Sequence, residues 1–390
     1  MKFKIKKIED YSLCIGCGLC ESLTNGNCQL KINEKGFLVP NIDYSFNDRE
    51  ISVLSRICPA INIKCTPKGK DEFGPIKEGV EAGSTDDIIR FRSASGGAVT
   101  SICQVLLKEK IVDGILQVGR CENHYMLNEL KISTTPEDVL QCASSRYAPV
   151  PVFANIISIL REMPDSYFGF VGKPCDIMTM KRLINEYPEF KGKIKYFISI
   201  ACAGIPSFSA TEYLIKKGNP ISNPISVKYR GDGWPGNFVV KYEDGTEFKC
   251  DYHKSWGEVL GRTLNFRCKI CPDGMGADAD IVVGDSWNTE DGYPDFSEAD
   301  GKSFILARTD NGKYLIQLAR ESNALQIANF DTSNLKKMHQ YQFLRLQTSF
   351  YKLIAAWICT RGLIRIKGLH IPKISVLKGL KTMIGTIKRF

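Results

Sequence analysis

Short apolar runs in the middle of the chain are each followed by a Gly/Pro loop and then by apolar residues at helical spacing. This order occurs in "YFGFVGKPCDIMTMKRLI" (167–184) and again in "KIKYFISIACAGIPSFSATEYLIKKG" (193–218). A third apolar run, "IVDGILQV" (111–118), follows a segment with helical spacing at Val99, Ile102, Cys103, Leu106 and Leu107. Strand–loop–helix repetition predicts parallel strands joined by right-handed crossovers, so we expect an α/β fold with Cys103 in its core.

The pattern changes to strand-like alternation in "ISVKYRGDGWPGNFVVKYEDGTEFKCDY" (225–252), which predicts a β-meander with a hairpin turn at Asp244-Gly245. This stretch contains a Gly-x-Gly-x-x-Gly at 231–236. A proline precedes its last glycine and a strand follows it, so we do not interpret it as a dinucleotide fingerprint. A further short strand is expected at "DIVVGD" (280–285), and the meander makes the predicted class mixed α/β and α+β.

The composition is that of an ordinary globular protein, with 43% hydrophobic and 24% charged residues in 390. The N-terminal "MKFKIKKIEDYS" has no apolar stretch after its lysines, so we expect no secretory signal and a cytoplasmic location. Fifteen cysteines in such a protein are expected to be metal ligands or reactive thiols, because disulfides belong to exported proteins. The four histidines show no metal-ligand spacing, which disfavours mixed Cys/His zinc sites.

The N-terminal segment contains a C-x2-C-x2-C spacing at Cys14, Cys17 and Cys20, which is typical of three ligands of a [4Fe–4S] cluster. In two-cluster ferredoxin segments, the fourth ligand is the Cys of a distant Cys-Pro, and Cys58-Pro59 fits that position. The positions that would serve a second cluster all lack cysteine: Thr24, Asp48, Ile51 and Leu54.

We therefore predict one [4Fe–4S] cluster in this segment, held by Cys14, Cys17, Cys20 and Cys58. Two alternatives remain open: Cys28 as the fourth ligand, or a degenerate segment without a cluster. A zinc ribbon would need two C-x2-C knuckles, which this segment lacks.

A second set of four cysteines follows in the predicted α/β region. Cys175 and Cys202 each follow an apolar strand, and Cys268 and Cys271 form a C-x2-C pair. Since the carboxyl ends of parallel strands meet at one edge of a sheet, these four thiols could converge around a second cluster. The alternatives are small buried residues, since free cysteine is among the most buried residue types, or a redox-active or zinc-binding set.

The excess positive charge is concentrated at the C-terminal end, where residues 332–390 contain twelve Lys and Arg residues and no Asp or Glu. The longest uncharged run there, "LIAAWICT", is far below the roughly 20 residues that span a bilayer. We predict a basic amphipathic tail over 326–390. This tail could pack on the body of the protein and leave a basic face in solvent. Alternatively, it could contact the anionic inner surface of a membrane. Nucleic acid is not an expected partner, because no basic run exceeds two residues.

Six blocks in order resemble the beta subunits of coenzyme F420 (deazaflavin) hydrogenases and dehydrogenases, and their polysaccharide-cluster relatives. After the ferredoxin-like segment, the blocks are "SASGGAVTSICQVLLKEKIVDG", "ASSRYAPVP", "FVGKPCDIMTMKRL", "ACAGIPS", "YRGDGW" and "RCKICPDGMGADADIVVGD". The resemblance divides the chain into the ferredoxin-like segment (1–70), a flavin-binding beta-subunit N-terminal region (71–160), a C-terminal domain with the second cysteine set (161–325) and the tail (326–390).

The resemblance implies bound FAD beside one or two [4Fe–4S] clusters, with use of deazaflavin left open. A Ser-Gly-Gly stretch at a helix entrance could approach a pyrophosphate, Arg146 could pair with a phosphate and Tyr147 could stack on a ring. The ordinary alternatives are that Ser95 caps a helix and that Arg146 is a surface residue. The candidate cofactor-binding residues are Ser95, Gly96, Gly97, Ser145, Arg146, Tyr147, Gly172 and Lys173.

Two motifs differ from the family's usual form: Gly-Thr-Pro-Cys-Gln is Gly172-Lys173-Pro174-Cys175-Asp176, and Cys-His-Gly is Cys202-Ala203-Gly204. Asp285, after a strand end, could face the cofactor cavity or act as a structural cap. We identify no catalytic acid or base.

The sequence thus predicts an iron–sulfur flavoprotein oxidoreductase that passes electrons between a one-electron carrier, such as a ferredoxin-like protein or redox subunit, and a two-electron acceptor. The alternative is a non-catalytic accessory relative in surface-polysaccharide assembly that retains one cluster.

Overall fold

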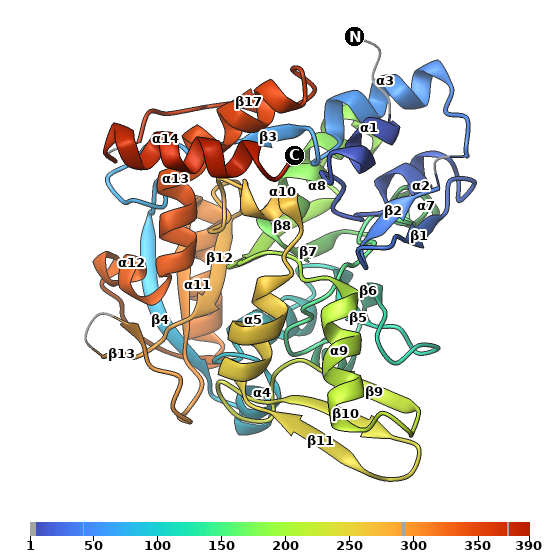
Figure 1. Cartoon of the computed structure of the whole chain (residues 1–390). Coiled ribbons are helices and arrows are strands. Elements are labelled where there is room, and N and C mark those ends of the chain that lie inside the picture. The colour runs from blue at the N-terminus through green and yellow to red at the C-terminus, as the bar shows by residue number, and fades with distance from the viewer. Residues whose placement is uncertain (1–4, 42, 291–292, 373) are drawn as a thin grey trace.

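The computed structural model describes residues 5–41, 43–290, 293–372 and 374–390. Its centre is an eight-stranded sheet, in which four parallel strands are extended by antiparallel strands at both edges (Figure 1). The predicted α/β fold is confirmed, and the three apolar runs chosen from the sequence are adjacent parallel strands. In spatial order the strands are β16 (Leu325–Asn329), β4 (Glu78–Ser84), β15 (Ser303–Ala307), β12 (Ile281–Asp285), β8 (Ile194–Ile200), β7 (Phe168–Gly172), β5 (Gly114–Arg120) and β6 (Asn128–Ser133).

Helices cover both faces of this sheet, because alternate residues of its strands point to opposite sides. On β5, Ile115 packs with the helices of one face and Leu116 with those of the other. The first face carries α5 (Ala98–Lys108), α6 (Pro136–Gln141) and α11 (Asp310–Glu321). The second carries α7 (Ile156–Glu162), α8 (Pro174–Glu186) and part of α13 (Gln340–Cys359). Cys103 is fully buried on α5, as predicted.

The predicted β-meander is present as a separate three-stranded sheet of β9 (Pro224–Lys228), β10 (Phe238–Tyr242) and β11 (Glu247–Cys250). The predicted turn is closed by Tyr242 and Thr246, and α9 (Phe208–Gly218) packs on the sheet. A strand follows the 231–236 glycine motif, as the sequence interpretation required.

Further helices and strands complete the fold. The α-helices among them are α1 (Ile5–Asp10), α2 (Leu19–Leu23), α3 (Asp48–Ile57), α4 (Asp87–Arg92), α10 (Phe266–Lys269), α12 (Leu335–Met338) and α14 (Val376–Ile387). Three short 3-10 helices, η1 (Pro188–Phe190), η3 (Leu260–Arg262) and η4 (Thr332–Asn334), and one π-helix, η2 (His253–Val259), are also present. The strands form three pairs: β1 (Leu30–Ile32) with β2 (Leu38–Pro40), β13 (Thr289–Glu290) with β14 (Tyr293–Pro294), and β3 (Asn62–Lys64) with β17 (Arg365–Lys367).

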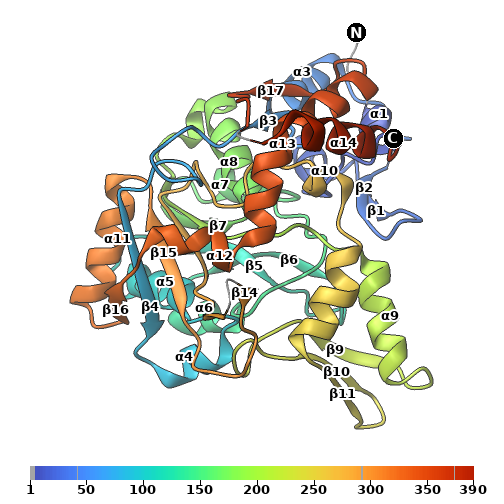
Figure 2. The same cartoon turned by 60° about the vertical axis from the view of Figure 1, so that its left-hand side comes forward.

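The two ends of the chain pack together at one end of the molecule, and the meander lies at the other (Figures 1 and 2). In the parallel pair of β3 with β17, Ile63 lies opposite Ile366. The ring of Phe390 contacts the rings of Tyr11 and Phe266, with centroids 6.0 and 4.7 Å apart. The tail is therefore part of the folded body around the N-terminal segment. None of the described helices has the length and apolar character needed to span a membrane.

Candidate metal centres

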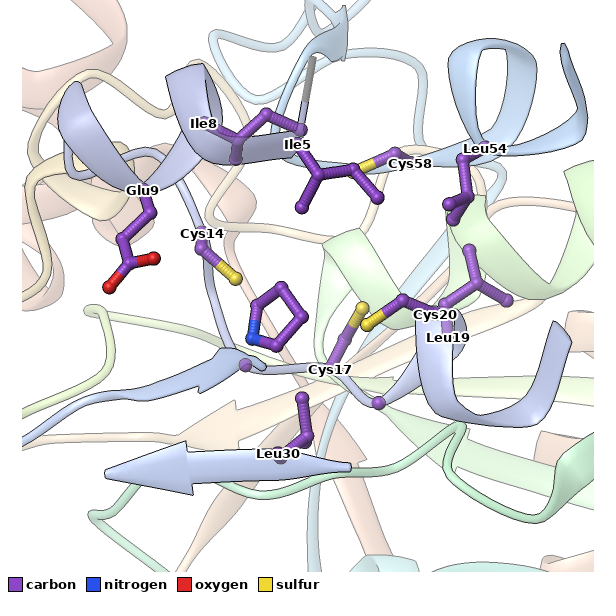
Figure 3. A pocket seen from close by; sticks show the side chains of 13 residues that line it. Ile5, Ile8, Glu9, Cys14, Cys17, Leu19, Cys20, Leu30, Leu54 and Cys58 are labelled. Carbon is purple, nitrogen blue, oxygen red and sulfur yellow. The ribbon is translucent and has the colours of Figure 1, made fainter. Parts of the chain in front are cut away.

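The first cysteine set surrounds one cavity between α1, α2 and the end of α3. Cys14, Cys17, Cys20 and Cys58 all line it, together with apolar side chains that include Ile5, Ile8 and Leu54. Figure 3 shows the four thiols approaching a common space from different sides, with Cys14 opposite Cys17 and Cys20.

The loop that carries the first three cysteines depends on two glycines. Gly16 and Gly18 have φ angles of 66° and 82°, in the left-handed region that favours glycine. A Cβ on Gly18 would lie 2.7 Å from the backbone nitrogen of Ala154, so a side chain there would clash with the backbone. The C-x2-C-x2-C loop can therefore fold tightly against the body only with glycine at this position.

Electrostatics at this cavity fit a positively charged occupant. Burial raises the pKa of Cys14 to about 12, and the pKa values of the Cys17 and Cys58 thiols are also raised by burial. Neighbouring thiolates raise the pKa of Cys14 and Cys17 further, because like charges repel. Backbone N–H groups, including those of Gly16 and Ala60, oppose this at the sulfurs of Cys14 and Cys58. Four such thiols can be deprotonated together only around a cationic core, which an iron–sulfur cluster supplies.

Cys28, the alternative fourth ligand, is fully buried but is not among the residues lining this cavity. Its Sγ lies 3.7 Å from the Asn41 carbonyl oxygen and hydrogen-bonds the Cys20 thiol, which lowers the pKa of Cys28. Thr24 holds this arrangement: its hydroxyl donates to the Cys20 carbonyl at 3.0 Å and accepts the Cys28 N–H at 2.9 Å. The geometry therefore favours Cys58 over Cys28.

The second cysteine set lines another cavity, at the carboxyl edge of the parallel strands. Cys175 lies in the first turn of α8, which follows β7, and Cys202 follows β8, which pairs in parallel with β7. Cys268 on α10 and Cys271 just after it complete the set, so all four thiols line this cavity.

Within the part of the chain that the structure describes, no group of three or more His, Cys, Asp or Glu side chains is placed to hold a metal ion. At both cavities the thiols are instead spread around the walls. A zinc ion would need its sulfur ligands about 2.3 Å from one point, whereas a [4Fe–4S] cluster takes one thiolate on each of four irons.

Cations surround the second cavity. Arg345 of α13 is buried and donates to the carbonyl oxygens of Cys202 and Ala203, at 2.7 and 2.8 Å. Lys173, which is partly buried, forms an ion pair of 2.6 Å with the buried Asp176 and lines the same cavity. Burial raises the pKa of Cys202 to about 12, and the charges of Arg345 and Lys173 oppose that rise. Sequence reasoning missed Arg345, because it lies far along the chain in a segment without a motif.

The two cavities share a wall. Ile15 and Pro59 line the second cavity, while their chain neighbours Cys14, Gly16 and Cys58 line the first. Ile15 forms one apolar cluster with Ile205 and Cys268, against which Cys17 and Cys175 also pack. Two hydrogen bonds stabilise the wall. The Asn265 side chain donates to the Cys14 carbonyl oxygen at 2.8 Å, and the Arg267 Nε donates to the Pro59 carbonyl oxygen at 3.2 Å. The two thiol sets are therefore separated by a shared wall that includes the apolar cluster around Ile15.

The Ser-Gly-Gly stretch at the entrance of α5 is engaged with the sheet. The Ser95 hydroxyl lies 2.8 Å from that of Ser303 and donates to the Lys302 carbonyl at 2.9 Å. A Cβ on Gly96 would lie 2.6 Å from the Ala82 carbonyl oxygen, so packing alone requires glycine here. Gly97, with φ 78°, caps the helix instead of Ser95.

Arg146 has an unsatisfied side chain. Its Nε is buried without a hydrogen-bond partner, and its Nη2 makes only a long contact of 3.4 Å with the Ala143 carbonyl. Burial lowers the pKa of this guanidinium. A buried guanidinium with a free N–H suits an anionic group such as a phosphate. Ser145 is half-buried beside it, and the Tyr147 ring lies 4.5 Å from Trp256. Of the other two residues predicted to bind the cofactor, Lys173 lines the second cysteine cavity, and Gly172 precedes it as the last residue of β7.

Asp285 is an ion-pair partner. Its two carboxylate oxygens each accept a hydrogen bond of 2.9 Å from Arg230, and one also accepts from Trp234 at 2.8 Å. The Arg230 side chain is 1% exposed and lies over the rings of Tyr252 and Trp287. Asp285 therefore has a structural role as the partner of Arg230 at the end of β12, which differs from the cap considered from the sequence.

Comparison with known proteins supports the resemblance seen in the blocks. The chain matches both parts of the family described as "Coenzyme F420 hydrogenase/dehydrogenase, beta subunit", the N-terminal part over residues 80–156 and the C-terminal part over residues 165–333. The Coenzyme F420 hydrogenase subunit beta of Methanococcus voltae is 27% identical over 262 residues, which cover 66% of this chain and 86% of that protein. The F420-dependent formate dehydrogenase 1 subunit beta of Methanococcus maripaludis is 26% identical over 287 residues, 70% of each chain.

A chain in a solved structure of the F420-reducing [NiFe] hydrogenase complex from Methanosarcina barkeri has the same fold. The TM-score is 0.53 at 21% identity, over 71% of this chain and 92% of that chain. The matched family regions include the second cysteine set and Arg146, whereas the first set and most of the tail lie outside them. The protein thus belongs to the coenzyme F420 hydrogenase/dehydrogenase beta-subunit family, whose characterised relatives are components of oxidoreductases.

Proposed function

We propose that the protein is an iron–sulfur flavoprotein that transfers electrons between a one-electron carrier and a two-electron acceptor. The observation that carries the proposal is the pair of cavities, each lined by four cysteines and separated by a shared apolar wall. The carrier would be a ferredoxin-like protein or the redox subunit of a larger complex. The names of the relatives make F420 the first acceptor to test.

The first set, Cys14, Cys17, Cys20 and Cys58, would hold one [4Fe–4S] cluster, and Cys175, Cys202, Cys268 and Cys271 would hold the other. When bound, such clusters supply single-electron chemistry, and FAD exchanges electrons singly or in pairs. The protein's own part is to bury the thiols, donate backbone N–H groups to their sulfurs, and exclude water from the wall at Ile15 and Pro59. Low solvent access and hydrogen bonds to sulfur both tune a cluster's potential.

FAD is the proposed flavin, with Arg146 as the residue that would pair with its phosphate groups. The support is the buried, unsatisfied Nε of Arg146 and the aromatic side chains of Tyr147 and Trp256 nearby. Since Ser95 and Gly96 bond to the sheet, their proposed role is to set the path of the loop. We propose a cytoplasmic location, because the described cysteines are all unpaired and thiol ligands need a reducing compartment.

Arg146→Gln should weaken flavin retention because it removes the positive charge offered to phosphate. A charge-assisted hydrogen bond is worth roughly 1.5–3 kcal/mol, so we expect a loss of flavin affinity of about 10- to 100-fold. The measurement is FAD per chain after gel filtration, followed by FAD titration of the stripped protein. Arg161→Gln is the matched control, since Arg161 is an exposed arginine paired loosely with Glu189 at 3.6 Å. Equal flavin affinity in both variants would reject Arg146 as a cofactor ligand.

Arg345→Gln should lower the reduction potential of a cluster in the second cavity, because a nearby cation favours the more negative, reduced state. One buried charge at an effective dielectric constant of about 20 is worth roughly 1–2 kcal/mol, or about 50–100 mV. The measurement is a potentiometric titration followed by electron paramagnetic resonance. Arg345→Lys keeps the charge and should restore most of the potential. An unchanged potential in the Gln variant, with iron content intact, would contradict this role.

The proposed function is tested with full-length protein purified without oxygen. Reduced methyl viologen serves as one-electron donor, with F420 and a quinone as two-electron acceptors. We expect about one FAD per chain, viologen oxidation that depends on an acceptor, and loss of that activity in Cys202→Ala. A chain without flavin that oxidises no viologen with either acceptor would overturn the oxidoreductase assignment.

A further inference from the structure

The last helix, α14, packs onto the body through its small and polar side and leaves its apolar side open. Gly379 and Thr386 are buried, and a Cβ on Gly379 would lie 2.1 Å from the ring of Tyr351 on α13. The aliphatic side chains of the same helix are 40–67% exposed: Val376, Leu377, Leu380, Ile384 and Ile387. We call these five residues the apolar stripe of α14.

This arrangement is the reverse of an ordinary surface helix, which buries its apolar side. Positions 376, 380, 384 and 387 follow helical spacing and so lie along one side of α14. A continuous row of exposed aliphatic side chains is costly in water and marks a contact surface. An occupant from outside the folded chain is therefore indicated.

We propose that the apolar stripe of α14 docks the protein on the surface of an anionic lipid bilayer. Lys378 and Lys381 are exposed on the same helix, Lys388 is exposed directly after its end, and residues 332–390 contain no acidic side chain. Aliphatic residues bordered by lysines are the composition of helices that lie in the interface of anionic membranes.

The stripe suits lipid better than a protein partner. It contains no aromatic side chain and no arginine, the residue types that dominate protein–protein hot spots. Helix α14 is about 18 Å long, so it can lie on a bilayer surface but cannot cross it. The helix is exposed beside the N-terminal segment, at the end of the molecule opposite the meander (Figures 1 and 2). Docking there would leave the meander end facing away from the membrane.

The test is co-sedimentation of the full-length protein with vesicles of phosphatidylcholine alone or mixed with phosphatidylglycerol. We expect binding only to the vesicles that contain phosphatidylglycerol, and a steep fall as salt is raised. The triple variant Lys378→Gln, Lys381→Gln, Lys388→Gln should bind on the order of 100-fold more weakly, because each lysine near an anionic surface contributes roughly fivefold.

A second triple variant, Leu377→Gln, Leu380→Gln, Ile384→Gln, removes the middle of the stripe and should also lose binding. The matched control is Ile221→Gln with Ile225→Gln, which changes exposed isoleucines at the start of the meander and should bind like the wild type. All variants should keep their melting temperature and iron content, because the altered side chains are exposed.

Two results would overturn the proposal. One is absence of binding, or equal binding to neutral and anionic vesicles. The other is a wild-type protein that ignores vesicles but self-associates in sedimentation velocity, with association lost in the apolar variant. That outcome would assign the stripe to a protein interface.

Discussion

Cys58→Ala should remove about four irons and four sulfides per chain, whereas Cys28→Ala should leave both counts unchanged. Both cysteines are within reach of the N-terminal triplet, so only geometry separates them. Cys58 lines the cavity with Cys14, Cys17 and Cys20, while Cys28 packs behind Cys20 against the Asn41 carbonyl. With one thiolate missing, three ligands and an apolar wall would hold the cluster poorly.

The measurement is iron and acid-labile sulfide per chain after anaerobic purification of both variants in parallel. Cys28→Ala is a stringent control, because it removes a fully buried thiol and so tests for general loosening of the segment. Loss of iron in the Cys28 variant with retention in the Cys58 variant would make Cys28 the fourth ligand. If neither variant loses iron, the prediction that this cavity holds a cluster is wrong.

Arg230→Met should lower the apparent melting temperature by about 5–10 °C, without changing any proposed cluster ligand. The substitution removes the cation that pairs with both carboxylate oxygens of Asp285 and leaves that carboxylate largely buried. Breaking one partner of a buried ion pair costs roughly 3–5 kcal/mol, and Asp285 is partly exposed, so the lower end of that range applies.

The double variant Arg230→Met, Asp285→Asn tests the cause of this loss. The asparagine removes the unpaired charge and can still accept the hydrogen bond from Trp234, so stability should recover in part. Melting curves of the single and double variants, recorded at one heating rate, measure both effects. A single variant that melts within about 1 °C of the wild type would show that the pair contributes little.

The parallel strands and the grouping of the cysteines could be predicted from the sequence, because both depend on local residue patterns. Each of the parallel strands predicted from the sequence is a short apolar run. A residue that follows the carboxyl end of such a strand lies at the carboxyl edge of the sheet. For this reason Cys175 and Cys202 could be placed on one edge from the residue pattern alone, and they line one cavity. Cys58 could be grouped with the N-terminal cysteines in a similar way, because a distant Cys-Pro is a property of ferredoxin segments, and it lines the same cavity as they do.

The surroundings of the thiols could not be predicted in the same way. Arg345 reaches Cys202 from a helix 143 residues further along the chain, and β17 pairs with β3 across a still longer separation. Contacts of this kind depend on how elements dock, which residue patterns do not encode. Helix α14 illustrates the limit: its periodicity shows an apolar side, but Tyr351 against Gly379 decides which side is buried.

The measurement that tests the central claim most directly is iron and acid-labile sulfide per chain in anaerobically purified full-length protein. Two thiol-lined cavities predict about eight of each, with electron paramagnetic resonance of two interacting [4Fe–4S] clusters on reduction. The shared wall at Ile15 and Pro59 is the reason to expect interaction between the two signals. A count of about four or fewer, or iron without sulfide, would contradict the two-cluster account.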